Sequence, residues 1–184
     1  MQLDPETLAV RDRYLLMIAT ILPRPIAWVA TISPDGVANL APFSFFMGIC
    51  ANPMTVCFAP VNDRNGKKKD TLINIELTKQ FTVSIVNETN AQKMNQTSAP
   101  YAYGVSEFEK CGVTPLKSVK VLPPRVKESP VSYECELQQI VRIGEGPLAG
   151  NLVIGKVVMF HCADDIYNGG KINHQDIHAI GRME

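Results

Sequence analysis

The chain lacks the features that mark several specialised classes of protein. Among its 184 residues there is no run of 18 apolar residues, so we expect no membrane-spanning helix. Its 18 basic residues are balanced by 18 acidic ones, which argues against nucleic acid as a partner. The 13 prolines and 12 glycines are scattered without a period, which excludes collagen-like and low-complexity chains.

Cysteine is present in an odd number and without a C-x-x-C spacing. Such a set favours free thiols over a disulfide framework or a zinc site. The first residues also lack a basic segment followed by an apolar core, the pattern of a secretory signal. We therefore expect a cytoplasmic protein with five free thiols, at positions 50, 57, 111, 135 and 162.

Histidine is scarce, with only three residues in the chain. His174 and His178 are four residues apart, with Asp176 between them, but no further ligand is defined nearby, so we expect no metal site. His161 precedes Cys162 near the end of an expected strand, where neighbours point to opposite faces. That placement disfavours a Cys–His catalytic pair and favours a structural histidine.

The order of the elements indicates a mainly β protein in which residues 1–184 form one domain. Strands are expected at residues 26–32, 37–40, 44–49, 55–59, 81–86, 131–143 and 152–162. Short helices are expected at 5–19, 71–78, 88–96 and 106–111, the first capped by Asp4 and the second by Asp70. Turns at 33–36 and 144–147 join neighbouring strands. Six or seven strands with few short helices predict a closed or partly closed antiparallel β-barrel.

A basic loop precedes the second of these helices. Arg64 and Lys67-Lys68-Lys69 lie just before Asp70 and Thr71, where a helix would begin. Free N–H groups and partial positive charge at a helix start suit a phosphate. The alternative is a solvated loop with Asp70 as an ordinary cap.

The segment from Asn39 to Phe46 does not alternate as a core strand would. It carries Pro42 and Ser44 among three phenylalanines. Proline is confined to strand edges and bulges, and a bulged strand can present backbone groups to the edge of a planar ring. The alternative is an aromatic core with an edge bulge. Chemistry alone therefore predicts a β-rich domain that binds a phosphorylated aromatic ligand.

Several ordered blocks resemble the flavin reductase-like family. They cover about residues 8 to 182: the runs at 23–31, 35–36, 39–46, 69–71, 74–75, 81–84, 104–108 and 181–182. The resemblance implies an FMN-binding split barrel, usually a homodimer with the flavin near the subunit interface.

On this pattern each candidate residue has an expected role. Thr31 and Ser33, with the backbone around Ala30, would lie along the ribityl and phosphate side. The edge of the isoalloxazine would be contacted by Ala41, Pro42, Phe43, Ser44, Phe45 and Phe46. The phosphate would be held by Arg64, Lys69 and Thr71, with Asp70 as their neighbour.

The resemblance also implies an activity. It predicts an NAD(P)H-dependent flavin reductase or a flavoredoxin-like electron-transfer protein, in which hydride passes from nicotinamide to flavin N5. His161 is the candidate for lining the nicotinamide face. The alternative is a non-enzymatic FMN carrier or flavin-storage protein, which would exchange electrons with a redox partner protein and not oxidise nicotinamide.

Overall fold

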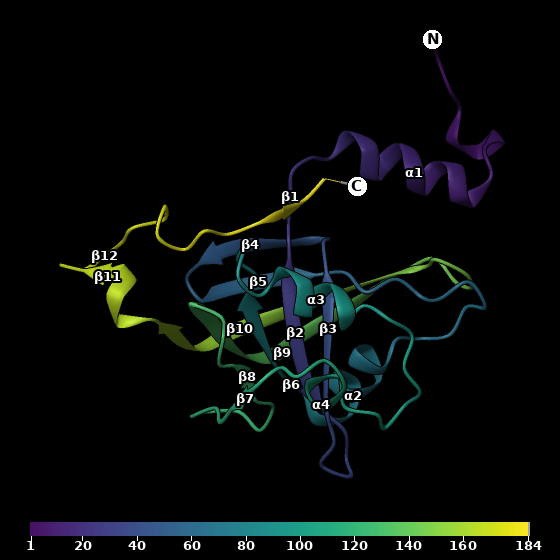
Figure 1. The fold of residues 1–184 in the computed structure, drawn as a ribbon. Helices are drawn as coiled ribbons and strands as arrows, with labels where there is room; N and C mark the ends of the chain where they lie inside the picture. The colour runs from purple at the N-terminus through teal and green to yellow at the C-terminus, as the bar shows by residue number, and fades with distance from the viewer. Residues whose placement is uncertain (184) are drawn as a thin grey trace.

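The computed structural model describes residues 1–183, and seven of the strands form one antiparallel sheet. They are β2 (Ala27–Ile32), β3 (Ala38–Phe43), β4 (Phe46–Ala51), β5 (Met54–Phe58), β6 (Gln80–Ile85), β9 (Val131–Ile143) and β10 (Gly150–Cys162). Their order in the sheet is β3-β2-β6-β9-β10-β5-β4. Because β3 and β4 lie at opposite ends of this order and yet only two residues separate them, the sheet must curl on itself (Figure 1). The predicted mainly β barrel is confirmed.

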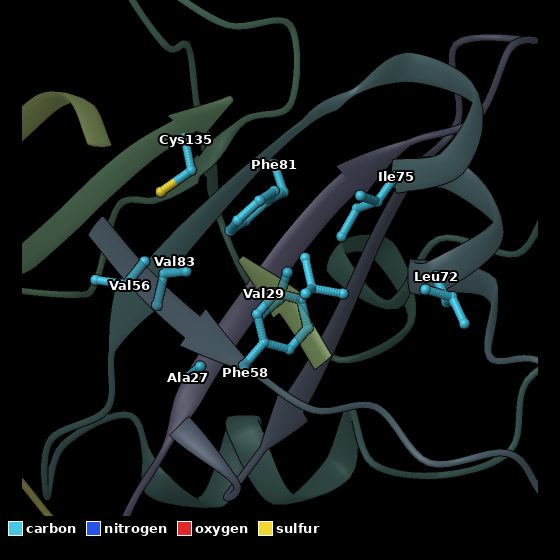
Figure 2. Close-up of a cluster of buried hydrophobic side chains, with 10 residues drawn as sticks. Ala27, Val29, Val56, Phe58, Leu72, Ile75, Phe81, Val83 and Cys135 are labelled. Atoms are coloured by element: carbon cyan, nitrogen blue, oxygen red, sulfur yellow. The ribbon is translucent and has the colours of Figure 1, made fainter. Parts of the chain in front are cut away.

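Apolar side chains from the inner face of this curled sheet form its core. Phe58 is fully buried at the centre, with its ring 5.1 Å from that of Phe43 and 5.4 Å from that of Phe81. Figure 2 shows this cluster, which also contains Ala27, Val29, Val56, Leu72, Ile75, Val83, Cys135 and Val153. All five cysteines are free thiols, as expected, and burial raises the pKa of Cys135 far above its usual range.

A second cluster covers the outer face of β2 and β3. Trp28, Ala30 and Leu40 pack there against Phe108 of α4 (Glu107–Lys110). The buried indole of Trp28 donates a hydrogen bond of 2.9 Å to Thr97 Oγ1, just after α3 (Ala91–Gln96). These contacts hold the chain between α3 and α4 next to β3.

The N-terminal helix differs from the prediction of one helix over residues 5–19. A 3-10 turn, η1 (Pro5–Thr7), is followed by an extended Leu8 and Ala9, and only then by α1 (Val10–Thr20). Asp4 caps η1, accepting a hydrogen bond from the backbone of Glu6, and does not cap α1. In Figure 1 α1 lies away from the barrel, and Ile18 is its one buried residue.

The predicted capping role of Asp70 is wrong. The helix α2 (Asp70–Thr78) has Lys69 at its cap position, with extended backbone, and no side chain caps it. Asp70 is instead the first helical residue, because the carbonyl of Lys69 already accepts the first hydrogen bonds of the helix, from the backbone N–H groups of Leu72 and Ile73. The remaining predicted strands and both predicted turns are present, including the hairpin of β9 and β10.

Short pairs of strands complete the fold. They are β1 (Arg24–Pro25) with β13 (Gly181–Arg182), β7 (Pro115–Leu116) with β8 (Arg125–Val126), and β11 (Tyr167–Asn168) with β12 (Lys171–Ile172), the last pair preceded by η2 (Asp164–Ile166). The β1–β13 pair brings the end of the chain beside β3 and β4. No helix within residues 1–183 is long and apolar enough to cross a membrane.

Candidate functional site

Two adjoining cavities lie along β3. The larger, about 450 Å³, runs from the loop before α2 to the segment between α3 and α4. The smaller, about 350 Å³, lies under the end of the chain at β13. Pro42, Phe43 and Ser98 line both of them. Together they form one groove, within the size range of small-molecule sites.

One end of the groove is basic. Lys67, Lys68 and Lys69 line it where α2 begins. Asp63 shapes the preceding turn by accepting hydrogen bonds of 2.8 Å from the backbone N–H groups of Asn65 and Lys67. The first turn of a helix has free N–H groups, so cationic side chains and backbone donors meet here.

Asp70 lies in the same first turn. Burial raises the pKa of its carboxyl group, and the positive charge of Lys69 partly opposes that rise.

A buried polar network forms the floor of the larger cavity. Asn39 Nδ2 donates to both carboxylate oxygens of Glu107 at 2.9 Å, and the backbone N–H of Leu40 donates to Glu107 Oε2 at 2.8 Å. Asn39 Oδ1 accepts from the hydroxyls of Thr31 at 3.2 Å and Thr71 at 2.9 Å. Burial raises the pKa of Glu107, opposed by these donors from Leu40 and Asn39. The network fixes Thr71 at the basic end.

The other end of the groove is apolar and has one placed hydroxyl. Phe43 packs its ring against Phe58 of the core and lines both cavities. Ser44 Oγ accepts a hydrogen bond of 3.3 Å from Nε of the buried Arg24. Because an arginine cannot accept, the Ser44 proton is left to donate to another group.

The predicted site residues divide into three sets. Those lining the groove are Ala41, Pro42, Phe43, Ser44, Lys69, Asp70 and Thr71. Three others are buried and do not line it: Thr31 is enclosed in the network of Asn39, Ala30 packs in the second apolar cluster, and Ser33 lies in the turn before β3. Those outside its lining are Phe45, which packs edge-on against Tyr14, Phe46, which packs on the core, and Arg64, exposed in the loop.

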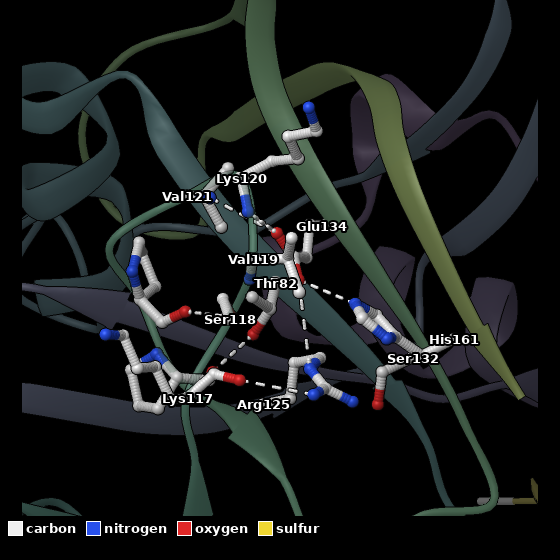
Figure 3. A network of polar contacts seen from close by, with 12 residues as sticks. Thr82, Lys117, Ser118, Val119, Lys120, Val121, Arg125, Ser132, Glu134 and His161 are labelled. Carbon is white, nitrogen blue, oxygen red and sulfur yellow. Dashed lines mark hydrogen bonds and ion pairs between the residues drawn. The ribbon is translucent and has the colours of Figure 1, made fainter. Parts of the chain in front are cut away.

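His161 lies elsewhere, on β10, and its side chain is held by Glu134 of β9. His161 Nε2 is 2.6 Å from Glu134 Oε1 (Figure 3). The fully buried Glu134 also accepts hydrogen bonds from the backbone N–H groups of Val119, Lys120 and Val121. Burial opposes ionisation of Glu134, but the backbone donors and His161 outweigh it and hold its pKa below the usual range. This placement favours the structural interpretation of His161.

Several residues of the groove were not predicted from the sequence. Asn39 and Glu107 lie inside the family-like blocks, which was a usable signal, but no role was given to them. Tyr101 and Tyr103 line the larger cavity from the segment after α3, and Ile180–Arg182 line the smaller one. Gly181 and Arg182 also lie in a family-like block, but no role was given to them, and only the β1–β13 pairing shows that they reach the groove.

The chain is similar in sequence and in structure to known proteins. A family model described as a flavin reductase like domain matches residues 19–176. The structure of nitrilotriacetate monooxygenase component B from Bacillus cereus is similar with a TM-score of 0.94 and 33% identity, covering 99% of this chain and 91% of that one.

Two further structures are similar over the whole chain. The 2-nitrobenzoate 2-nitroreductase of Pseudomonas fluorescens has a TM-score of 0.86 at 26% identity, covering 100% of this chain and 88% of its own. A Shewanella frigidimarina protein with a split barrel domain has a TM-score of 0.82 at 26% identity, covering 100% of this chain and 92% of its own. The curled sheet described above is therefore a split barrel.

Proposed function

The chain belongs to the flavin reductase-like family, and from this premise we propose that its whole length is one domain that binds FMN and oxidises NAD(P)H. Membership makes it a flavin-related oxidoreductase; the choice of FMN and of nicotinamide is the proposal. The observation that carries it is the shape and charge of the groove along β3. A basic helix start and an apolar, aromatic wall lie at the two ends of one groove.

The basic end fits a phosphate. Lys67 and Lys69 are exposed and line the cavity beside the first N–H groups of α2. Thr71 can turn its proton toward an anion without leaving Asn39 Oδ1 unpaired, because Thr31 continues to donate to that oxygen. Donors of this kind bind phosphate oxygens strongly.

The apolar end fits a planar ring. Pro42 and Phe43 offer an apolar face, and the Ser44 hydroxyl is oriented by Arg24 so that it can donate to an acceptor atom on the ring edge. When bound, a flavin would supply the hydride-transfer chemistry with nicotinamide. Pro42 and Phe43 would contact one face of its ring, and the Ser44 hydroxyl would bind its edge.

His161 is left out of this proposed machinery. Its Nε2 is committed to Glu134, and it is absent from the lining of both cavities as described for residues 1–183. A catalytic role for His161 stays a prediction that these contacts do not support.

The proposal is tested by absorption spectroscopy without air. We expect the purified protein to bind FMN and the flavin band to bleach promptly when NADH or NADPH is added. A bound flavin that stays oxidised with both nicotinamides, but is reduced by a protein donor, would favour the carrier or storage alternative. Failure to bind FMN in a titration would contradict the proposal.

We also propose that the protein is a homodimer that associates through the exposed edge strand β4. Met47 is 60% exposed, Ile49 46% and Met54 42%, around a shallow depression of about 630 Å³. Unpaired edge strands with apolar side chains favour pairing with another chain.

The five free thiols support a reducing, cytoplasmic location.

The dimer is tested by light scattering with size-exclusion chromatography. We expect twice the mass of one chain for the wild type and a shift toward the monomer for Met47→Lys, because the substitution places a charge in the apolar contact. Leu122→Lys, at a residue that is 72% exposed in the loop between β7 and β8, is the control. A monomeric wild-type protein would contradict this assignment.

A further inference from the structure

The loop that carries the lysines is attached to the hairpin of β9 and β10 through residues that are not among those lining the groove. The backbone N–H of Asn62 donates to the carbonyl of Ala149 at 2.9 Å. The backbone N–H of Asn151 donates to the carbonyl of Pro60 at 3.1 Å. Asn62 Nδ2 donates to the carbonyl of Gly146 at 3.1 Å. Residues 60–62, at the base of the loop, are therefore hydrogen-bonded to the end of the hairpin.

The two backbones also approach closely at the tip of the loop. A Cβ on Gly66 would lie 3.2 Å from the carbonyl carbon of Gly146, and Gly66 has a φ of +80°. Both the conformation and the space require glycine here. The loop thus rests directly against the hairpin turn.

One buried side chain joins the parts of this contact. Asn151 is 4% exposed, and its Nδ2 donates to Asn62 Oδ1 at 3.0 Å and to the carbonyl of Pro60 at 3.3 Å. Its Oδ1 accepts from Nη1 of Arg142, its partner across the hairpin, at 3.5 Å. Both ends of the amide are used.

Arg142 extends the contact to the other end of the loop. Its Nη2 lies 2.6 Å from Oε1 of Glu76 on α2, and Glu76 Oε2 lies 2.8 Å from Nζ of Lys68. Burial opposes ionisation of Glu76, but the bonds from Lys68 and Arg142 outweigh it and hold its pKa below the usual range. Lys68 is therefore tied to the helix and hairpin, while Lys67 and Lys69 stay available to a ligand.

We infer that Asn151 and Arg142 are positioning residues for phosphate binding, acting on the lysine loop from outside the groove. The inference rests on the proposed function, since it takes the lysine loop as the FMN phosphate site. Anion binding needs donors held in place, and a loop released from the hairpin must be ordered again when the ligand binds. The ring end, on β3 and β13, shares none of these contacts. Affinity for the phosphate should therefore depend on the hairpin, and affinity for the ring should not.

The test compares FMN with riboflavin, which has the same ring and ribityl chain without the phosphate. Dissociation constants are measured by fluorescence quenching on the flavin-free full chain. For Asn151→Ala we expect the FMN constant to rise about tenfold, because two hydrogen bonds that hold the loop are lost, and the riboflavin constant to change less than about twofold. Gln139→Ala, which removes an exposed amide from the same hairpin, should leave both constants unchanged.

A second variant avoids the buried position. Arg142 is 53% exposed, and Arg142→Gln should raise the FMN constant about threefold, again without affecting riboflavin. Amide hydrogen exchange without ligand should also be faster at Asn65 and Lys67 in Asn151→Ala. An equal loss of affinity for both flavins, unchanged constants, or unchanged exchange would overturn the inference. A wild-type chain that binds neither flavin would instead overturn the proposed function and this inference with it.

Discussion

Replacing Lys69 and Thr71 together with alanine is expected to weaken FMN binding about 100-fold. The double variant removes one cation and one hydroxyl from the basic end of the groove, where both line the cavity at the start of α2. Charge-assisted hydrogen bonds are each worth about 1.5–3 kcal/mol, and Lys67 retains part of the attraction. Titration of the flavin-free protein with FMN measures the loss.

Two comparisons show whether this loss belongs to the phosphate. Riboflavin affinity should change little, because the apolar wall of Pro42 and Phe43 is untouched. Lys117→Ala removes an exposed lysine from another loop and should leave FMN binding unchanged. An FMN affinity equal to that of the wild type would contradict the location of the phosphate site.

Replacing Glu134 by alanine is expected to lower the free energy of unfolding by about 3 kcal/mol at pH 7. The substitution leaves the backbone N–H groups of Val119, Lys120 and Val121 without their acceptor and His161 without its partner. Buried donors without partners cost more than the bonds themselves contribute. Urea unfolding followed by circular dichroism measures the difference in unfolding free energy. The comparison requires that this free energy falls with urea concentration at the same slope in the two proteins.

The effect of pH checks the same carboxylate independently. The folded pKa of Glu134 lies below its usual range, so ionised Glu134 stabilises the fold above the unfolded pKa of about 4.3. That contribution is lost as the pH falls through the folded pKa, so the difference between wild type and variant should shrink in acid. Glu136→Ala, at an exposed glutamate two residues along β9, is the control. A loss below about 1 kcal/mol at pH 7, the size of a surface ion pair, would contradict the prediction.

Local chemistry was enough to predict most strands and turns. The bounds of β9 agree with the prediction of residues 131–143, and the turn before β3 closes through Ser33 and Gly36, whose φ is +84°. Turn residues and alternating burial act over a few residues, so the sequence shows them directly. The two errors, the helix over 5–19 and the cap at Asp70, concern the ends of helices, where a residue or two decides the geometry.

The candidate site could be predicted only in part. Lys69 and Thr71 lie next to a helix start, and Pro42 lies in an irregular strand, so each carried a local signal. The partners of buried polar groups carried none. Glu107 of α4 is 68 residues from Asn39 and meets it only through tertiary packing. Glu134 and His161 are 27 residues apart, and the register of the β9–β10 hairpin brings them together.

By itself, therefore, the sequence determined the class of fold, the order of the strands along the chain and the position of the basic loop that we propose as a phosphate site. The tertiary structure decided that this loop, β3 and the end of the chain line one groove, and that the β9–β10 hairpin supports the loop from behind. The physical reason is the distance along the chain over which each interaction acts. Turn chemistry and strand alternation are local, whereas a cavity and a buried hydrogen-bond network require the closure of the sheet, which the whole chain determines.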